Sequence, residues 1–505
     1  MTSLNSMVAF DSWARVVDIF VDALPVLEMG FQHSMLKKEG NVPYHPADLF
    51  KLLLYGYRNG IRSANKLHEA TRINVEVMWL LKGLRPSART INYFRSTNGK
   101  AIEKAHRHFV KLLKEWQLIE GTTLALDGVK IRAQNSLKRN FNAKKIERHV
   151  EYIENKMSHY LEQLDQVDKA PYSARKKKEK RKIIAAKQAE LEVRKTDYEQ
   201  LSKELEKSEE PQISLTDPDA RAMIKHGSRE VGYNIQAVAD GKNNMLVDIF
   251  VGGVNDMYEL GKAAKRSQEI VEEKYIDMLA DKGYHTGSEL AEAERRGVRP
   301  FVAVKTNKPQ KEKGFRKEDF TYNAKSDSYT CPIGERLAYL HTFKRGKVKK
   351  PYRVKRYGTA HCEDCPLREK CTENKAGRFI ERAVHQPYID RNNKRVTRYK
   401  EFYRLRQQII EHIFGTWKRQ WGMDHTLLMG KEKVVTEYRI AGIAYNLRRS
   451  LSILGLAELK RRLNALFFVI FSLWRTISRQ VYVNNDFGKM KRLIPGASME
   501  PHGGI

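Results

Sequence analysis

Three acidic residues stand where they could bind divalent metal ions together. Asp127 ends a short apolar run that begins at Thr122, and Asp281 ends a second run that begins at Tyr275. Each run predicts a buried strand that ends in an acid, with a glycine within two residues. Two such strands side by side bring two rigidly held carboxylates within reach of one ion. One strand-terminal aspartate alone is weak evidence, because aspartate favours strand ends and turns in any case.

The third acid, Glu411, lies in a segment with helical spacing. Apolar residues surround it, and Lys418 follows two helical turns later on the same face. Carboxylates suit Mg²⁺, which prefers oxygen ligands, keeps several waters and also accepts phosphate oxygens. With two ions, an attacking oxygen is activated while the leaving oxygen is stabilised, so no covalent protein nucleophile is needed.

A second candidate metal site consists of the four cysteines of the chain. They are Cys331, Cys362, Cys365 and Cys371. Four thiolates satisfy a tetrahedral zinc ion, and a small insertion with little core gains its fold from the metal. The last two cysteines are spaced Cys-x5-Cys rather than as a tight knuckle, so His341 or His361 stays open as a substitute ligand. Reduced cysteines without metal are the alternative.

The charge of the chain favours a polyanionic partner. Lys and Arg number 93 against 61 Asp and Glu, which gives a formal charge of +32. Each phosphate that Lys or Arg neutralises releases condensed counterions, so nucleic acid is the partner that such a chain suits. The start of the chain lacks the features of a secretory signal. The apolar run Ala465–Trp474 is too short to cross a bilayer, and we expect a cytoplasmic protein without a membrane span.

The elements before residue 119 are predicted to be helices. They are Pro46–Tyr57, a helix capped by Ser63, Val75–Leu81, and a long basic helix from Ser87 through Leu112. Short helices followed by one that carries Arg89, Arg95 and Lys100 suit a DNA reader of the helix-turn-helix kind. A plain helical dimerisation domain is the alternative for residues 1–118.

The middle of the chain alternates strands and helices. Strands are predicted at Thr122–Asp127, Gly232–Ala239, Met245–Val251, Tyr275–Asp281 and Arg299–Val304, and helices at Tyr258–Lys274, Glu289–Arg296, Tyr399–Trp417 and Val434–Leu454. This order predicts an α/β fold with a mixed sheet flanked by helices.

A helical hairpin is predicted to interrupt this order over residues 140–210. The apolar positions Ile146, Val150, Ile153, Met157, Tyr160, Leu164 and Val167 follow a heptad, and so do Ile184, Leu191, Tyr198 and Leu205. Ala170-Pro171 lies between the two series and predicts an antiparallel coiled-coil hairpin. The basic run Arg175–Lys182 near its tip is either a solvated face or a contact to DNA phosphates.

Three ordered blocks resemble bacterial insertion-sequence transposases of the DDE superfamily. These are TLALDGVKIRAQNS, DKGYHTGSEL and IIEHIFGTWKRQWGM, with AGIAYNLRRS downstream. The resemblance implies a ribonuclease-H-like core in residues 119–310 and 394–460, split by the hairpin and by a zinc-bearing insertion at 311–393, with a basic tail at 461–505. It also implies that Asp127, Asp281 and Glu411 are the DDE triad. In the related YREK signature, Glu411 and Lys418 fit the spacing, whereas Tyr403 and Arg406 each stand one residue early.

The resemblance implies an enzyme that uses Mg²⁺ or Mn²⁺ to cleave double-stranded DNA at transposon ends and to join 3′ ends to target DNA. A homodimer in the bacterial nucleoid is expected, because two ends must be paired. The basic residues expected to contact DNA are Lys130, Arg404, Arg406, Lys418 and Arg419. Trp417 and Trp421 could stack an unpaired base, although core packing is favoured. The rivals are a transposase-derived protein that only binds DNA and a nuclease or resolvase on the same core.

Overall fold

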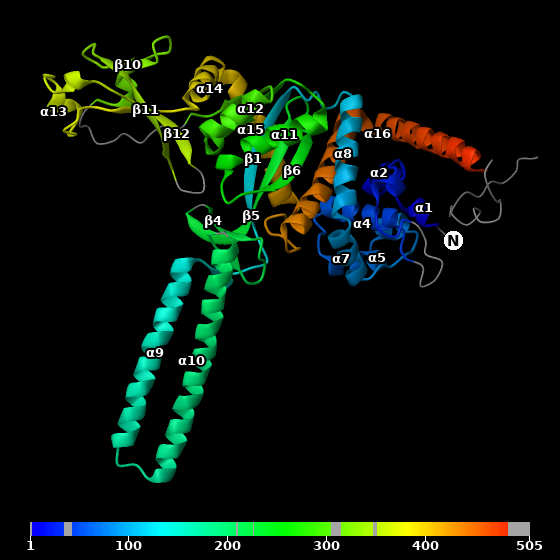
Figure 1. The fold of residues 1–505 in the computed structure, drawn as a ribbon. Helices are drawn as coiled ribbons and strands as arrows, with labels where there is room; N and C mark the ends of the chain where they lie inside the picture. The colour runs from blue at the N-terminus through cyan, green and yellow to red at the C-terminus, as the bar shows by residue number, and fades with distance from the viewer. Residues whose placement is uncertain are drawn as a thin grey trace, which may run out of the picture. The chain divides into compact units, whose positions relative to one another are not determined.

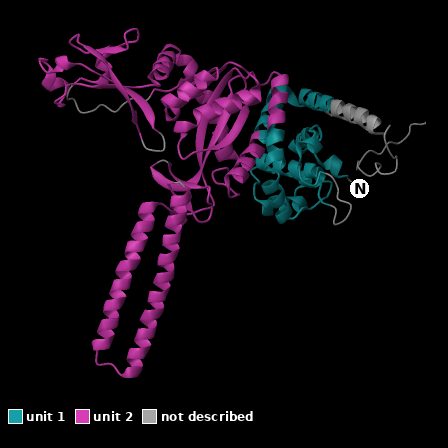
Figure 2. Ribbon diagram, viewed as in Figure 1, with its two compact units in different colours: residues 1–106, 443–505 teal, residues 107–442 magenta. Residues whose placement is uncertain are grey.

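The computed structural model describes residues 3–34, 43–208, 211–225, 227–304, 315–346 and 351–482. The chain divides into two compact units, Met1–His106 with Ile443–Ile505, and Arg107–Gly442 (Figures 1 and 2). Of the core segment predicted at 394–460, residues 394–442 therefore belong to the second unit and residues 443–460 to the first. None of the helices in the described ranges combines the length and the apolar character that crossing a bilayer requires.

The N-terminal part of the first unit is helical. Its helices are α1 (Leu4–Met7), α2 (Trp13–Asp22), α3 (Val26–Met29), α4 (Pro46–Arg58), α5 (Ala64–Ile73), α6 (Val75–Leu80) and α7 (Ala88–Thr97). The side chain of Ser87 accepts a hydrogen bond from the backbone N–H of Thr90, as its predicted capping role requires. Ser63 precedes α5 without such a side-chain bond.

The long helix predicted from Ser87 through Leu112 is two helices, α7 and α8 (Gly99–Glu115). The break falls at Asn98, which is buried, donates from its side chain to the Phe94 carbonyl at 2.9 Å and accepts from the Gln32 N–H at 2.7 Å. An asparagine that bonds neighbouring backbone competes with the helical ladder. Arg95, expected to read DNA, is only 2% exposed and donates to Tyr57 and to the Arg62 carbonyl. Its role is therefore structural.

The C-terminal helix α16 (Lys431–Tyr482) contains the helix predicted over Val434–Leu454. It changes direction at Gly455, whose φ of 74° is readily available to glycine alone. Residues 483–505 of the predicted basic tail lie outside the described residues, as do the side chains of the apolar run beyond residue 466.

The second unit contains a six-stranded mixed sheet. Its strands are β1 (Thr123–Arg132), β4 (Arg221–Lys225), β5 (Ser228–Asp240), β6 (Leu246–Gly252), β7 (Ile276–Ala280) and β8 (Val298–Val302). The order is β6-β5-β1-β7-β8, and β4 pairs with the start of β5. β5 is antiparallel to both β6 and β1, whereas β1, β7 and β8 are mutually parallel.

Four helices pack on or beside this sheet. They are α11 (Leu260–Val271), α12 (Gly287–Arg295), α14 (Gln386–Arg398) and α15 (Lys400–Gly415). α11 contacts β6, α12 and α14 contact β8, and α15 lies over β1, β5 and β7 (Figure 1). The buried face of α15 consists of Ile409, Ile410 and Ile413, together with Arg406. The predicted α/β fold with a mixed sheet flanked by helices is confirmed.

Two long helices, α9 (Ala143–Lys169) and α10 (Ala174–Ser208), lie side by side (Figure 1). Ion pairs join Asp168 to Arg181 near the turn and Glu154 to Lys195 further down, so the helices are antiparallel. At the base, β2 (Asn140–Phe141) pairs with β3 (Ile213–Ser214). The hairpin is therefore inserted through a narrow, hydrogen-bonded neck between β1 and β4.

A second, antiparallel sheet lies within the predicted insertion 311–393. Its strands, in sheet order, are β13 (Ile380–Ala383), β12 (Tyr352–Gly358), β11 (Arg336–Arg345), β10 (Ser328–Thr330) and β9 (Thr321–Asn323). A small core is formed by Phe320, Tyr329, Leu337, Tyr357 and Ile380. The insertion therefore has more apolar core of its own than its sequence led us to expect.

Candidate active site

Asp127 and Asp281 stand at the same level of two adjacent parallel strands, each directly after the last residue that pairs β1 with β7. The last paired residues of β1 and β7 are Leu126 and Ala280, and the two aspartates come next. β7 ends at that point, whereas β1 continues to Arg132, so the strand predicted to end at Asp127 is longer than expected. β1 continues because β5 pairs with it along its whole remaining length. The two carboxylates predicted to work together are thus neighbours in the sheet.

The Asp127 side chain is largely buried and has two hydrogen-bond donors. Oδ1 accepts from the Gly128 N–H at 2.8 Å, and Oδ2 accepts from Nη1 of Arg406 at 3.1 Å. Burial raises the pKa of Asp127 to about 6, against the opposing effect of Arg406, and the negative charges of Asp256 and Asp281 raise it further. An acid with a raised pKa beside other acids is a candidate functional group.

Asp281 and Glu411 are held less tightly. Oδ1 of Asp281 accepts from the Lys282 N–H at 2.7 Å, at the start of a short 3-10 turn, Lys282–Tyr284. The Glu411 side chain is 57% exposed, and its Oε1 lies 3.9 Å from Nη2 of Arg406. One guanidinium therefore links the first and third predicted acids.

The helix face that meets the acids carries Tyr403 and Arg406. The positive charge of Arg406 is offset by the negative charges of Asp127 and Asp281. Burial lowers the pKa of Arg406, but these acids raise it above its ordinary value. Burial raises the pKa of Tyr403, which interacts with Arg406 and lies near both aspartates. Arg404 is exposed and pairs with Glu401 at 2.6 Å. Tyr403 and Arg406, which each stand one residue early in the YREK signature, are thus the residues that interact with the aspartates.

The helix that carries Glu411 does not continue regularly to Lys418. α15 ends at Gly415, and Thr416–Gln420 forms a π-helix. Lys418 therefore does not follow Glu411 on one continuous regular helix, because a π-helical turn is wider than an α-helical one. Single π-helical turns are frequent at functional sites.

The remaining residues predicted to contact DNA, Lys130, Lys418 and Arg419, all belong to the second unit. Arg419 is exposed and Lys418 partly exposed, while Nζ of Lys130 donates to the Ile224 carbonyl at 2.7 Å. Trp417 and Trp421 are each 1% exposed, and Trp417 packs against Phe414 and Tyr438. Core packing, the favoured interpretation of the two tryptophans, is confirmed.

Asp256 is a fourth acid in this region that the sequence interpretation missed. It follows β6, and its Oδ1 accepts from Asn234 Nδ2 and Gln236 Nε2, both at 2.8 Å. Gln236 in turn accepts from the hydroxyl of the buried Tyr284. The signal was two amides on one face of a buried strand, Asn234 and Gln236, which need a polar partner.

Gly128 is required where these groups converge. A Cβ at this position would lie 2.4 Å from Gln236 Nε2 and 2.7 Å from Asp256 Oδ1. We expect Gly128→Ala to displace the amide pair and to destabilise the chain by about 1 to 3 kcal/mol, the usual cost of overpacking. A lowered midpoint of thermal unfolding checks this. Gly415→Ala has no heavy atom within 4 Å of its new Cβ and lies in a helix, so it should leave the midpoint equal or higher. Equal midpoints for both variants would contradict the expected crowding.

The oxygen donors of this site suit a hard divalent cation, but they do not form a ready cage. In the described ranges, no three or more residues among His, Cys, Asp and Glu lie close enough together to hold a metal ion. At the predicted triad, the guanidinium of Arg406 touches Asp127 and reaches Glu411.

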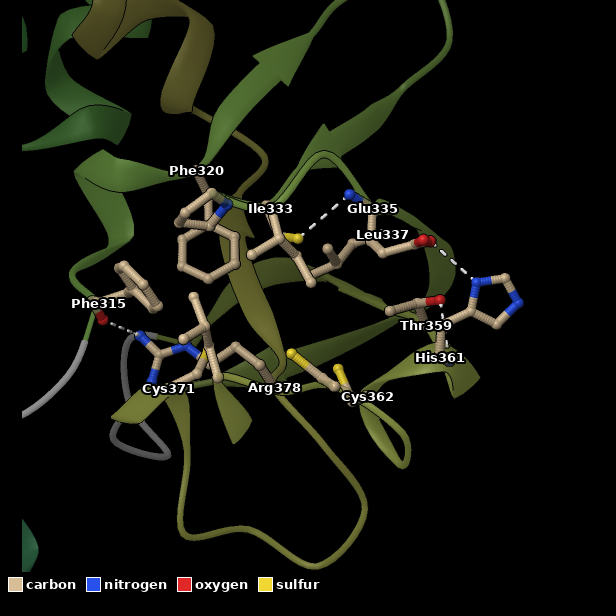
Figure 3. Close-up of a pocket in the computed structure, with 14 residues that line it drawn as sticks. Phe315, Phe320, Ile333, Glu335, Leu337, Thr359, His361, Cys362, Cys371 and Arg378 are labelled. Carbon is tan, nitrogen blue, oxygen red and sulfur yellow. Dashed lines mark hydrogen bonds and ion pairs between the residues drawn. The ribbon is translucent and has the colours of Figure 1, made fainter. Parts of the chain in front are cut away.

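The four cysteines line one cavity of about 30 Å³ beside the small sheet (Figure 3). All four are free thiols. Burial raises the pKa of Cys371, Arg378 opposes this, and the other three cysteines add to the increase. The four cysteines thus line one cavity, although no three of them form a group that could hold a metal ion in the described ranges.

Of the two histidines left open as substitute ligands, His361 lines this cavity and His341 does not. Nδ1 of His361 lies 2.9 Å from Oε2 of Glu335, so its imidazole is directed to a carboxylate (Figure 3). The Glu335 N–H donates to Sγ of Cys331 at 3.3 Å. The cavity wall therefore combines the four thiols with apolar side chains such as Phe320 and Leu337.

Two family comparisons match separate parts of the chain. A transposase DDE domain matches residues 330–451, and a transposase domain of the DUF772 type matches residues 3–97. The first match includes Glu411, and neither reaches Asp127 or Asp281. No curated protein matches the chain.

Among solved structures, the chain is similar to piggyBac transposase in a synaptic complex with hairpin DNA. The identity is 10%, the match covers 97% of this chain and 84% of that chain, and the TM-score is 0.29.

Proposed function

Because the chain carries two transposase domains and is a DDE-type insertion-sequence transposase, we propose that it cleaves the ends of its element and joins the freed 3′ ends to target DNA. Asp127, Asp281 and Glu411 are the acids that we assign to this chemistry. The observation that carries the assignment is the register of β1 and β7, whose last paired residues, Leu126 and Ala280, each come immediately before one of the two aspartates.

The arrangement of the large sheet supports a ribonuclease-H-like core. Three antiparallel strands, β6, β5 and β1, are followed across the sheet by two parallel ones, β7 and β8. α15 lies over the central strands and carries Glu411. In this proposal two acids come from the sheet and the third comes from a helix packed on it.

The donor set fits Mg²⁺ or Mn²⁺, because every proposed ligand atom is a carboxylate oxygen. When bound, such ions activate an attacking oxygen and stabilise a leaving oxygen. β1 orients Asp127 from within the sheet, the end of β7 orients Asp281, and Glu411 is exposed enough to adjust. Arg406 and Lys418 supply positive charge for the phosphates of the DNA end.

The test uses the full chain, labelled DNA that carries the element's own ends, and a target plasmid. We expect cut and joined products with Mg²⁺ or Mn²⁺ and none with EDTA. Binding without cleavage in any metal would indicate a DNA-binding relic of a transposase. Cleavage without joining would indicate a nuclease or resolvase.

We assign Asp256 a positioning role, since it fixes the amides of Asn234 and Gln236 and adds negative charge beside Asp127. Asp256→Asn keeps the shape and an acceptor oxygen but removes the charge. We expect cleavage and Mn²⁺ affinity to fall about 10- to 100-fold, as for other residues that support metal ligands. Calorimetric Mn²⁺ titration checks the affinity. A matched control is Asp277→Asn on β7, which removes a carboxylate paired with Arg299 and should leave both quantities unchanged. Wild-type affinity in Asp256→Asn would remove Asp256 from the site.

We propose that the four cysteines hold a structural zinc ion. Their shared cavity supports this, and thiolates are the donors that zinc prefers. Toward the other end of β11 and β12, exposed basic side chains such as Lys344 and Arg353 suit contact with DNA backbone. The remaining assignments are residues 1–118 as a DNA-binding domain, and a homodimer that pairs two element ends.

A further inference from the structure

Arg406 combines three properties that a DNA contact alone does not require. It is only 8% exposed, although it carries a permanent charge. Nη1 is bonded to Asp127 at 3.1 Å, and Nη2 faces Glu411 at 3.9 Å. Its Nε is buried and has no hydrogen-bond partner among the described residues. A buried guanidinium with an unsatisfied N–H is held at a cost, so charge rather than complete hydrogen bonding accounts for its position.

The atoms that Arg406 contacts are those proposed to bind metal. Oδ2 of Asp127 accepts from Nη1, while Oδ1 already accepts from the Gly128 N–H. A divalent cation at Asp127 would therefore lie beside a guanidinium in a partly buried site, where like charges repel strongly. Arg406 and the metal ion compete for the same carboxylate.

We propose that Arg406 is a built-in counter-cation that neutralises the acids while no metal is bound and is released from Asp127 when a divalent ion binds. The released guanidinium becomes available to bind a phosphate of the DNA end. Metal binding and DNA binding are therefore linked through one side chain. This inference rests on the proposed function of the same site.

The first experiment uses the wild-type chain without DNA. Arginines are modified with phenylglyoxal with and without saturating Mn²⁺, and each site is quantified by peptide mass spectrometry. Mn²⁺ should accelerate modification of Arg406 roughly fivefold or more, because the ion shifts the population toward the released side chain. Arg404 is an exposed internal control, and Arg266, paired with the buried Asp248, reports any general loosening. Neither control should respond to the metal.

The second experiment measures Mn²⁺ affinity at pH 8 by calorimetry. Arg406→Gln removes the competing charge, so Mn²⁺ should bind roughly tenfold more tightly. Arg404→Gln makes the same charge change two residues earlier, and its affinity should stay within about twofold of wild type, as expected for an exposed charge in high dielectric. If Arg406 only supported the structure, the Arg406→Gln variant would bind Mn²⁺ more weakly than the wild type, because loss of the arginine would leave the acids less well held.

An Arg406 modification rate that Mn²⁺ leaves unchanged or slows would overturn the inference, even if the chain cleaves element ends. If Arg406→Gln does not fold, the modification experiment still decides, since it needs no variant. Acceleration at Arg406 in a chain that never cleaves or joins DNA would support the counter-cation and contradict the proposed transposition. The two claims therefore fail separately.

Discussion

Glu411→Gln is expected to bind element-end DNA like the wild-type chain and to lose cleavage and joining by about 10³-fold or more, the scale seen when one member of a catalytic group is removed. The substitution is nearly isosteric and removes one negative charge. The Glu411 side chain is 57% exposed, so little folding energy depends on it. Labelled-end cleavage and a gel-shift titration measure the two quantities on the same samples.

Glu401→Gln is the matched control, because it removes an exposed carboxylate from the same helix. Its cleavage rate should stay near that of the wild type. If Glu411→Gln cuts and joins at the wild-type rate, Glu411 is not the third acid and the chemistry lies elsewhere. If the Glu411→Gln variant loses DNA binding as well, Glu411 contributes to DNA binding rather than to the reaction.

Removing zinc is expected to unfold one side of the insertion while its sheet persists. The stretch from Thr359 to Phe379 contains only two short helices, Ala360–Cys362 and Arg368–Cys371, and three of the four cysteines. The sheet has its own apolar core. A bound structural zinc contributes on the order of 10 kcal/mol in small domains, so its loss should free this stretch. Elemental analysis should find about one zinc per chain, and far less in a Cys362→Ser and Cys365→Ser double variant.

Hydrogen exchange shows which part of the insertion unfolds when zinc is lost. In the double variant, amides between residues 359 and 379 should exchange rapidly, while those of β11 and β12 remain protected. His361→Asn and His341→Asn are the controls and should keep their zinc if the four cysteines are the ligands. Zinc loss in His361→Asn would make that histidine a ligand. Wild-type protein without zinc would favour reduced, unliganded cysteines.

The acids of the candidate site were predictable because each follows or interrupts an apolar pattern. Asp127 and Asp281 end apolar runs, and Glu411 stands among buried isoleucines. Their mutual placement was not predictable, because it depends on the pairing of β1 with β7, which are separated by about 150 residues. Local patterns carry no register between strands so far apart. The same limit hid Asp256, whose amide partners lie on another strand.

The sequence pattern also failed to predict two departures from regular helical geometry. The hydrophobic spacing of Ile91, Phe94 and Ile102 continues across the break at Asn98, so periodicity alone predicts one helix. At the break, the Asn98 side chain donates to the Phe94 carbonyl and accepts a long-range hydrogen bond from the Gln32 N–H. Likewise, the π-helix after Gly415 leaves no mark in the apolar spacing, although it interrupts the regular helix between Glu411 and Lys418.

The neck of the helical hairpin has a consequence for the order of folding. β1 must find β5 across about 100 residues of chain, since Arg132 pairs with Gly232. Closing so long a loop carries an entropic cost that grows with its length. α9 and α10 contact each other within a local stretch, and their pairing brings Asn140 beside Ser214. Early formation of the hairpin would thus shorten the search that joins the two strands, and the central sheet would assemble as if the inserted residues were a short loop.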